Sequence, residues 1–169
     1  MNTTRVLLVS LLSVAVLAGC SKKVKEQPVA DTTPTAPSTA PSTGSGLYGP
    51  EDLDTDACLR QRVVYFDLDQ DALKPEFQNI IGCHSKYLRD RPSARITLQG
   101  HADERGSRAY NQGLGERRGN AVNSALQAAG GSAGQLEVVS YGEERPVCTE
   151  SNEACWSQNR RVEIIYTAR

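Results

Sequence analysis

The sequence predicts a two-layer α/β fold in which helices pack on one face of a mixed sheet, with the element order βαβαββ. Short apolar runs typical of strands alternate with longer segments whose apolar residues recur at helical spacing. A last apolar run follows a long polar loop and adds a final strand. The first third of the 169 residues is not expected to fold compactly, so the remainder is expected to form one small domain.

The first strand and the first helix are expected on either side of Pro75. Residues 63–68 form an apolar run, which is typical of a central strand. Pro75 suits the first position of a helix, where its missing N–H has no intrahelical partner to lose, and Pro92 is expected to end that helix. The buried stripe of the helix is predicted to consist of Phe77, Ile80, Ile81, His84 and Leu88.

The second half of the domain begins with a strand over residues 94–100. A polar turn follows at residues 101–105, and it leads into a long helix that Gly130 and Gly131 close. The third strand is expected at residues 136–141, and the last at 161–167 after a long loop. The apolar face of the long helix is predicted to consist of Leu114, Ala121, Val122, Ala125 and Leu126.

Arg118 interrupts the apolar face of the long helix. It lies four residues after Leu114 and four before Val122, so a permanent cation points where an apolar side chain is expected. A buried guanidinium needs an anion, and Asp103 in the preceding turn is the nearest candidate in sequence. The two charges either face one pocket and hold a small zwitterion, or pair with each other and brace the turn. Physical arguments alone leave both interpretations open.

Five segments of the chain carry a resemblance to a known family. They read VVYFDLDQDAL, GHADERG, YNQGLGERRGNAV, VVSYGEERP and NRRVEIIY, and they follow in this order between residues 63 and 166. The chain resembles the OmpA-like peptidoglycan-binding domain family, whose two-layer sandwich agrees with the fold predicted above. The resemblance implies a binding module that is not an enzyme and needs no cofactor.

The resemblance also implies a ligand and the residues that hold it. In such domains an aspartate and an arginine, here Asp103 and Arg118, grip the meso-diaminopimelate of the peptidoglycan stem peptide. Leu68, Asp69, Asn111 and Leu114 would surround this ligand, with Arg105 at the rim. Lipoproteins with this domain bind peptidoglycan, TolB and other Tol proteins, and support envelope integrity and cell division, so the same partners are expected here.

The N-terminal third is expected to secrete and anchor the domain. Residues 1–19 have the short apolar stretch of a signal peptide, and Cys20 follows it as in a bacterial lipobox. By that resemblance Cys20 is lipidated and attaches the protein to the outer membrane. Residues 20–50 are rich in Pro, Thr and Ser and predict a disordered tether. Residues 51–169 would then form the domain in the periplasm.

Four cysteines remain when Cys20 is set aside, and an oxidising periplasm permits them to pair. Four cysteines allow three connectivities. We expect Cys148–Cys155, which would fix the loop before the last strand, and Cys58–Cys83, which would tie the segment before the first strand to the first helix. Neither pairing follows from the family pattern.

The residues give little support to other classes of function. A net charge of −1 gives no electrostatic case for nucleic acid. A metal hydrolase acting on the cell wall could use His101 and Asp103, which are two residues apart. His84 is the only other histidine and falls on a buried stripe, so three ligands with an open position are hard to assemble. Asp67, Asp69 and Asp71 resemble half of a calcium loop, but they lack its glycine and distal glutamate.

Overall fold

The computed structural model describes residues 46–169. The predicted signal peptide, residues 1–19, and the lipidation site Cys20 lie outside the described residues, as does most of the tether predicted at 20–50. Within residues 46–169, no helix is both long and apolar enough to cross a membrane.

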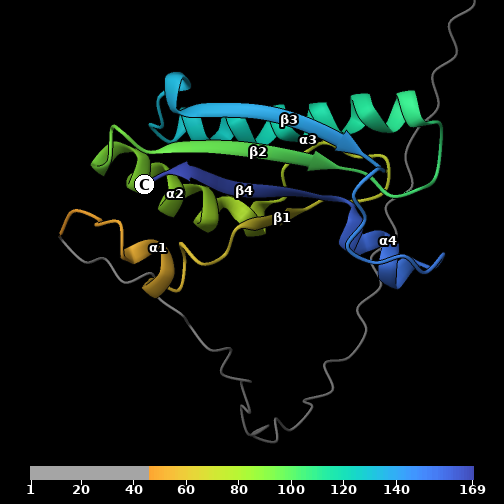
Figure 1. Cartoon of the computed structure of the whole chain (residues 1–169), viewed down its shortest axis with the longest axis horizontal. Helices are drawn as coiled ribbons and strands as arrows, with labels where there is room; N and C mark the ends of the chain where they lie inside the picture. Colours follow the sequence, from red (N-terminus) through yellow and green to blue (C-terminus); the bar gives the residue numbers. More distant parts are fainter. Residues whose placement is uncertain (1–45) are drawn as a thin grey trace, which may run out of the picture. The chain divides into compact units, whose positions relative to one another are not determined.

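Four strands form one mixed sheet (Figure 1). They are β1 (Val63–Tyr65), β2 (Arg95–His101), β3 (Leu136–Gly142) and β4 (Arg161–Ala168), arranged in the order β1-β4-β2-β3. Strands β2 and β3 are parallel, and β4 runs antiparallel to both of its neighbours, β1 and β2. The predicted α/β class and mixed sheet are confirmed.

The first strand is shorter than predicted, and it lies at an edge of the sheet rather than in its centre. The last strand takes the central place, because β4 inserts between β1 and β2. Beyond Tyr65 the chain turns away from the sheet, and the carbonyl groups of Asp67 and Gln70 accept hydrogen bonds from Arg118 instead of from a neighbouring strand. The apolar run reflects burial of alternate residues on one face, since Val64 and Phe66 are buried while Tyr65 is exposed.

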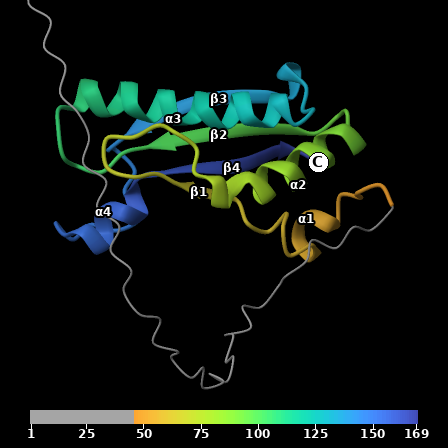
Figure 2. The same cartoon turned by 180° about the vertical axis from the view of Figure 1, so that it is seen from behind.

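Two helices cover the same face of the sheet (Figure 2). Helix α2 (Gln78–Asp90) follows a short 3-10 turn, η1 (Pro75–Phe77), and α3 (Arg108–Ala128) links β2 to β3. The core lies between these helices and the sheet and includes Ile80, Ile81, Leu88, Ile96, Leu98, Val122, Leu126, Val162 and Ile164. Three short elements were not predicted: α1 (Asp52–Thr55), η2 (Ala133–Gln135) and α4 (Glu153–Asn159).

Helix α3 lies unusually close to β2 because two glycines meet. A Cβ atom on Gly100 would lie 1.9 Å from the carbonyl oxygen of Gly115, so a side chain at residue 100 would push the helix away. This close approach brings the first turns of α3 against the carboxyl end of β2. The polar turn predicted between these elements therefore lies directly beside the helix.

Both predicted disulfides are present. Cys58 bonds to Cys83 with a Cα–Cα distance of 6.2 Å, and Cys148 bonds to Cys155 at 4.9 Å. The first ties the segment before β1 to α2, and the second closes the loop that leads into α4.

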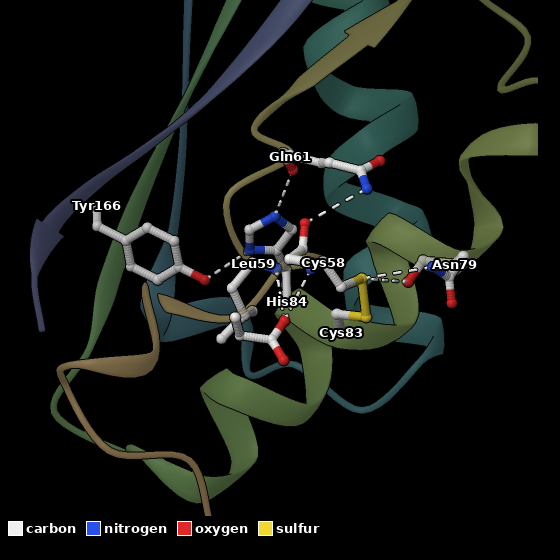
Figure 3. Close-up of a disulfide and its surroundings, with 9 residues drawn as sticks. Cys58, Leu59, Gln61, Asn79, Cys83, His84 and Tyr166 are labelled. Carbon is white, nitrogen blue, oxygen red and sulfur yellow. Dashed lines mark hydrogen bonds between the residues drawn. A yellow bond between two sulfur atoms is a disulfide. The ribbon is translucent and has the colours of Figure 1, made fainter. Parts of the chain in front are cut away.

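His84 is a packed core histidine, as predicted, and it lies next to the Cys58–Cys83 disulfide (Figure 3). Its Nε2 atom is 2.9 Å from the carbonyl oxygen of Gln61, which can only accept, so Nε2 carries a proton. Its Nδ1 atom is 2.7 Å from the hydroxyl of Tyr166 and accepts a hydrogen bond from it. The neutral ring therefore satisfies both partners, and burial lowers the pKa of His84 to about 4.

Stability is expected to fall in mild acid because of this histidine. Its pKa rises from about 4 in the folded state to about 6.5 in the unfolded chain. The unfolded state thus binds more protons between these values, and the stabilisation present above pH 6.5 is lost as the pH falls through 4. At about 1.4 kcal/mol per pKa unit, His84 should account for a loss of up to about 3.5 kcal/mol in the free energy of unfolding as the pH falls.

Urea unfolding at a series of pH values would measure this decline. Burial also lowers the pKa of His101 to about 4, so the wild-type curve contains a share from both histidines. The variant His84→Gln keeps a donor for Gln61 and an acceptor for Tyr166 but does not titrate, and it should remove the His84 share alone. An unchanged pH dependence in this variant would contradict the prediction.

Candidate ligand-binding site

A pocket of about 430 Å³ opens where β2 meets α3. Its wall consists of Leu68, Asp69, Asp103, Arg105, Gly106, Tyr110, Asn111, Leu114 and Arg118. All seven residues predicted to surround a ligand therefore line one cavity. Its volume falls in the range that suits a small molecule or the end of a peptide.

Three segments build the wall of the pocket. The loop after β1 contributes Leu68 and Asp69, the turn after β2 contributes Asp103, Arg105 and Gly106, and the first three turns of α3 contribute the rest. Ser107 is the N-cap of α3, and its hydroxyl accepts a hydrogen bond from the backbone N–H of Tyr110 at 3.2 Å. The turn thus delivers its side chains at the carboxyl end of a central strand, a common location for sites in α/β folds.

Arg118 is fully buried at the base of this pocket. Three of its N–H groups donate to the backbone carbonyls of Gln70 (2.8 Å), His101 (2.9 Å) and Asp67 (3.0 Å). A guanidinium has five N–H groups, so two have no acceptor among residues 46–169. Burial lowers the pKa of Arg118 to about 10, and the charge of Asp103 opposes this shift, so the side chain is a cation at neutral pH.

Asp103 is also buried, but its partners are other arginines. Its carboxylate accepts from the Nε (3.1 Å) and Nη2 (2.7 Å) atoms of Arg105 and from the Nη1 atom of Arg160 (3.2 Å). Burial favours the neutral acid, but the hydrogen bonds from Arg105 and Arg160 outweigh it and hold the pKa of Asp103 below its usual value. Asp103 is therefore an anion at neutral pH.

No ion pair joins Asp103 to Arg118 in the part of the chain that the structure describes. The alternative in which these two residues brace the turn by pairing directly is therefore wrong. Both charges instead line the same cavity, each held by separate neighbours. The result is a small pocket that presents a buried anion and a buried cation.

Asp69 lies opposite the turn and has an unusual backbone conformation. Its φ of 57° falls in the left-handed region, which aspartate tolerates better than most residues. The hydroxyl of Tyr110 donates a hydrogen bond to its carboxylate, which points it toward the pocket that both residues line. The neighbouring Asp67 and Asp71 pair with Lys74 and Arg117 and do not line the pocket.

The metal-site alternative finds no support in this geometry. His101 ends β2 rather than lying in the turn, and its side chain is buried. Within residues 46–169, no three His, Cys, Asp or Glu side chains come together in a way that could hold a metal ion. His101 and Asp103 therefore lack the third ligand that a catalytic zinc ion requires.

Sequence reasoning missed two residues that shape the site. Tyr110 orients Asp69, and Arg160 holds Asp103 from a position 57 residues away in the chain. Both fall inside the segments that carried the family resemblance, but no local pattern assigns them a contact. The contact of Arg160 with Asp103 depends on β4 lying beside β2, which brings the residue before β4 to the end of β2. The contact of Tyr110 with Asp69 joins α3 to the loop after β1.

Comparison with known proteins identifies the family of this chain. A model of the OmpA family matches residues 65–160, more than half of the chain. The chain belongs to the OmpA family. A relative in Pseudomonas putida, named peptidoglycan-associated lipoprotein, is 43% identical over 157 residues, which are 90% of this chain and 91% of the relative. One of the same name in Pasteurella multocida is 38% identical over 165 residues, or 96% and 97% of the two chains.

Solved structures agree with this membership of the OmpA family. The crystal structure of the peptidoglycan-associated lipoprotein from Burkholderia pseudomallei has a TM-score of 0.67 and 40% sequence identity, and the match covers 68% of this chain and 98% of that one. The C-terminal domain of Helicobacter pylori MotB has a TM-score of 0.58 at 23% identity, covering 63% and 84%, and supports the fold alone. This membership bears out the prediction that the chain is not an enzyme.

Proposed function

We propose that this protein binds peptidoglycan non-covalently through the meso-diaminopimelate of the stem peptide and anchors the outer membrane to the cell wall. The observation that carries the proposal is the joint presence of Asp103 and Arg118 in one pocket without a bond between them. The names of the relatives, peptidoglycan-associated lipoprotein, support the same class of function.

The chemistry of the pocket suits the end of a diaminopimelate side chain. That group carries an ammonium and a carboxylate on one carbon, so it can offer a cation to Asp103 and an anion to Arg118. Hydrogen bonds to charged groups contribute about 1.5–3 kcal/mol each when they are well formed. Asp69 supplies a second anion at the mouth of the pocket, and Leu68 and Leu114 supply apolar contacts for the methylene chain.

We further propose that Cys20 is lipidated and that the protein belongs to the Tol–Pal system, with TolB as a partner. The names of the relatives support a lipoprotein. The family resemblance supports the Tol–Pal system and TolB. A lipid anchor in the outer membrane and a peptidoglycan-binding domain on one chain would link the two layers of the envelope. Such a link would support envelope integrity and cell division.

Co-sedimentation with purified sacculi tests the ligand. Residues 46–169 contain the whole described core and would be used as a soluble fragment. The fragment should pellet with sacculi that contain meso-diaminopimelate, and the free tripeptide L-Ala-γ-D-Glu-meso-diaminopimelate should release it. The matched control is the tripeptide ending in L-lysine, which keeps the ammonium but lacks the carboxylate for Arg118. Retention in the supernatant, or equal release by the two peptides, would refute the proposal.

A further inference from the structure

The carboxylate of Asp103 is fully engaged by donors from the protein itself. It accepts the backbone N–H and the Nε–H of Arg105 on one oxygen, each at 3.1 Å. On the other oxygen it accepts Nη2 of Arg105 at 2.7 Å and Nη1 of Arg160 at 3.2 Å. A carboxylate offers about four acceptor positions. A ligand ammonium that binds Asp103 must therefore displace one of these donors.

The side chain of Arg105 is the donor that can leave. Arg160 is only 7% exposed and is also held by the carbonyl oxygen of Phe66 at 3.1 Å and by Glu153 at 2.5 Å. The side chain of Arg105 is 32% exposed and lines the pocket. Moving Arg105 therefore uncovers Asp103 from the side of the pocket, whereas moving Arg160 would break buried contacts.

Helix α4 offers a second location for the Arg105 guanidinium. Its Nη2 atom already lies 3.5 Å from a carboxylate oxygen of Glu153, and its Cζ atom lies 4.1 Å from the centre of the Trp156 ring. A guanidinium gains free energy from stacking on an indole face and can slide across it without losing that contact. The carboxylate of Glu153, which would accept the Arg105 guanidinium, thus lies close to the carboxylate of Asp103, which Arg105 would leave.

Trp156 is held in place by its surroundings rather than by Arg105 alone. Its indole N–H donates to Glu104 at 3.0 Å, and the preceding residue, Cys155, is buried and bonded to Cys148. The side chain of Asn159 bonds to the backbone N–H and the carbonyl oxygen of Cys148 and so closes the same segment. The disulfide-closed segment therefore presents a fixed aromatic surface to Arg105.

We propose that the Arg105 side chain occupies the ammonium position at Asp103 and moves across Trp156 to Glu153 when a cationic ligand takes its place. Trp156 and Glu153 are then positioning residues that set how readily the pocket accepts a ligand. The arrangement makes a cation on the ligand obligatory, because only a cation can replace Arg105 beside the buried Asp103. This inference rests on the proposed diaminopimelate site and adds a specificity device to it.

Trp156 is the only tryptophan of the chain, so its fluorescence reports on Arg105 directly. The tripeptide L-Ala-γ-D-Glu-meso-diaminopimelate should change the emission of the wild-type protein with the same Kd that calorimetry gives. In Arg105→Ala, calorimetry should still detect binding within about tenfold of wild type, since Asp103 and Arg118 remain, but the emission change should be lost. A tripeptide with an acetylated diaminopimelate amine should leave the emission of both proteins unchanged.

A double-mutant cycle tests the role of Glu153. Glu153→Gln should weaken tripeptide binding about fivefold in the wild-type background. An effect of this size corresponds to the loss of one exposed ion pair, here between Glu153 and the displaced Arg105. The same substitution should have no further effect on Kd in the Arg105→Ala background, because the guanidinium that Glu153 would accept is absent there. An effect that persisted there would instead come through Arg160. The control is Glu150→Gln, which removes the same charge from the same segment, and its Kd should equal that of wild type.

The outcomes separate this inference from the function on which it rests. If the wild-type protein does not bind the tripeptide by calorimetry, both proposals are wrong. If it binds but the emission of Trp156 does not change, or if Glu153→Gln is equally harmful with and without Arg105, the displacement of Arg105 is wrong and the diaminopimelate site stands. A coincident Kd by both methods, with an emission change that depends on Arg105, establishes the displacement.

Discussion

Replacing Asp103 by alanine should weaken binding to meso-diaminopimelate sacculi about a hundredfold, because truncating one member of a buried charge pair typically costs 2–5 kcal/mol. The ligand ammonium would lose its anion and would instead face the cations Arg105 and Arg160. Affinity would be measured by co-sedimentation at increasing sacculus concentration.

The domain should remain folded in this variant. Arg160 keeps its contacts with Phe66 and Glu153, and Arg105 can reach Glu153 or solvent. Circular dichroism would check this. The matched control is Asp71→Ala, which removes a carboxylate in the loop after β1 that pairs with Arg117 and does not line the pocket. If both variants lost affinity equally, general electrostatic attraction rather than the pocket would explain binding.

Replacing Arg118 by methionine should lower the free energy of unfolding by roughly 4–5 kcal/mol, with urea unfolding as the measurement. Methionine fills much of the volume but leaves the carbonyl groups of Asp67, Gln70 and His101 without their donor. Each stranded acceptor costs about 1–3 kcal/mol when it stays buried. Arg118 thus holds the loop after β1 against the end of β2, in addition to its proposed contact with a ligand carboxylate.

Two further variants define this role of Arg118. Arg117→Met changes the neighbouring residue, whose side chain is 49% exposed, and should alter stability by no more than about 1 kcal/mol. Arg118→Lys keeps the charge, but a single ammonium cannot reproduce the planar set of donors, so it should be destabilised and should bind peptide poorly. Near wild-type stability of Arg118→Met would show that the three carbonyls find other partners.

The candidate site could be located from the sequence because its two central charges, Arg118 and Asp103, stand out from local patterns in the chain. A cation at residue 118 on an apolar helical face, and an anion in the turn before that helix, are both visible in the spacing of side chains along the chain. The ligand and the outer members of the site came from the family resemblance. The two disulfides were expected, though spacing alone left three pairings open.

The sequence by itself thus determined the order of the main strands and helices and the apolar faces of the two long helices, because these follow from periods of 3.6 and 2 residues along a chain. Only the tertiary structure decided that β4 is central and β1 an edge, and that Arg118 binds three carbonyls while Asp103 binds Arg105 and Arg160. The contacts between Arg118 and Asp67 and between Asp103 and Arg160 join residues 51 and 57 positions apart. Such pairings depend on how whole strands and helices pack, so the local periodicity of the sequence does not predict them.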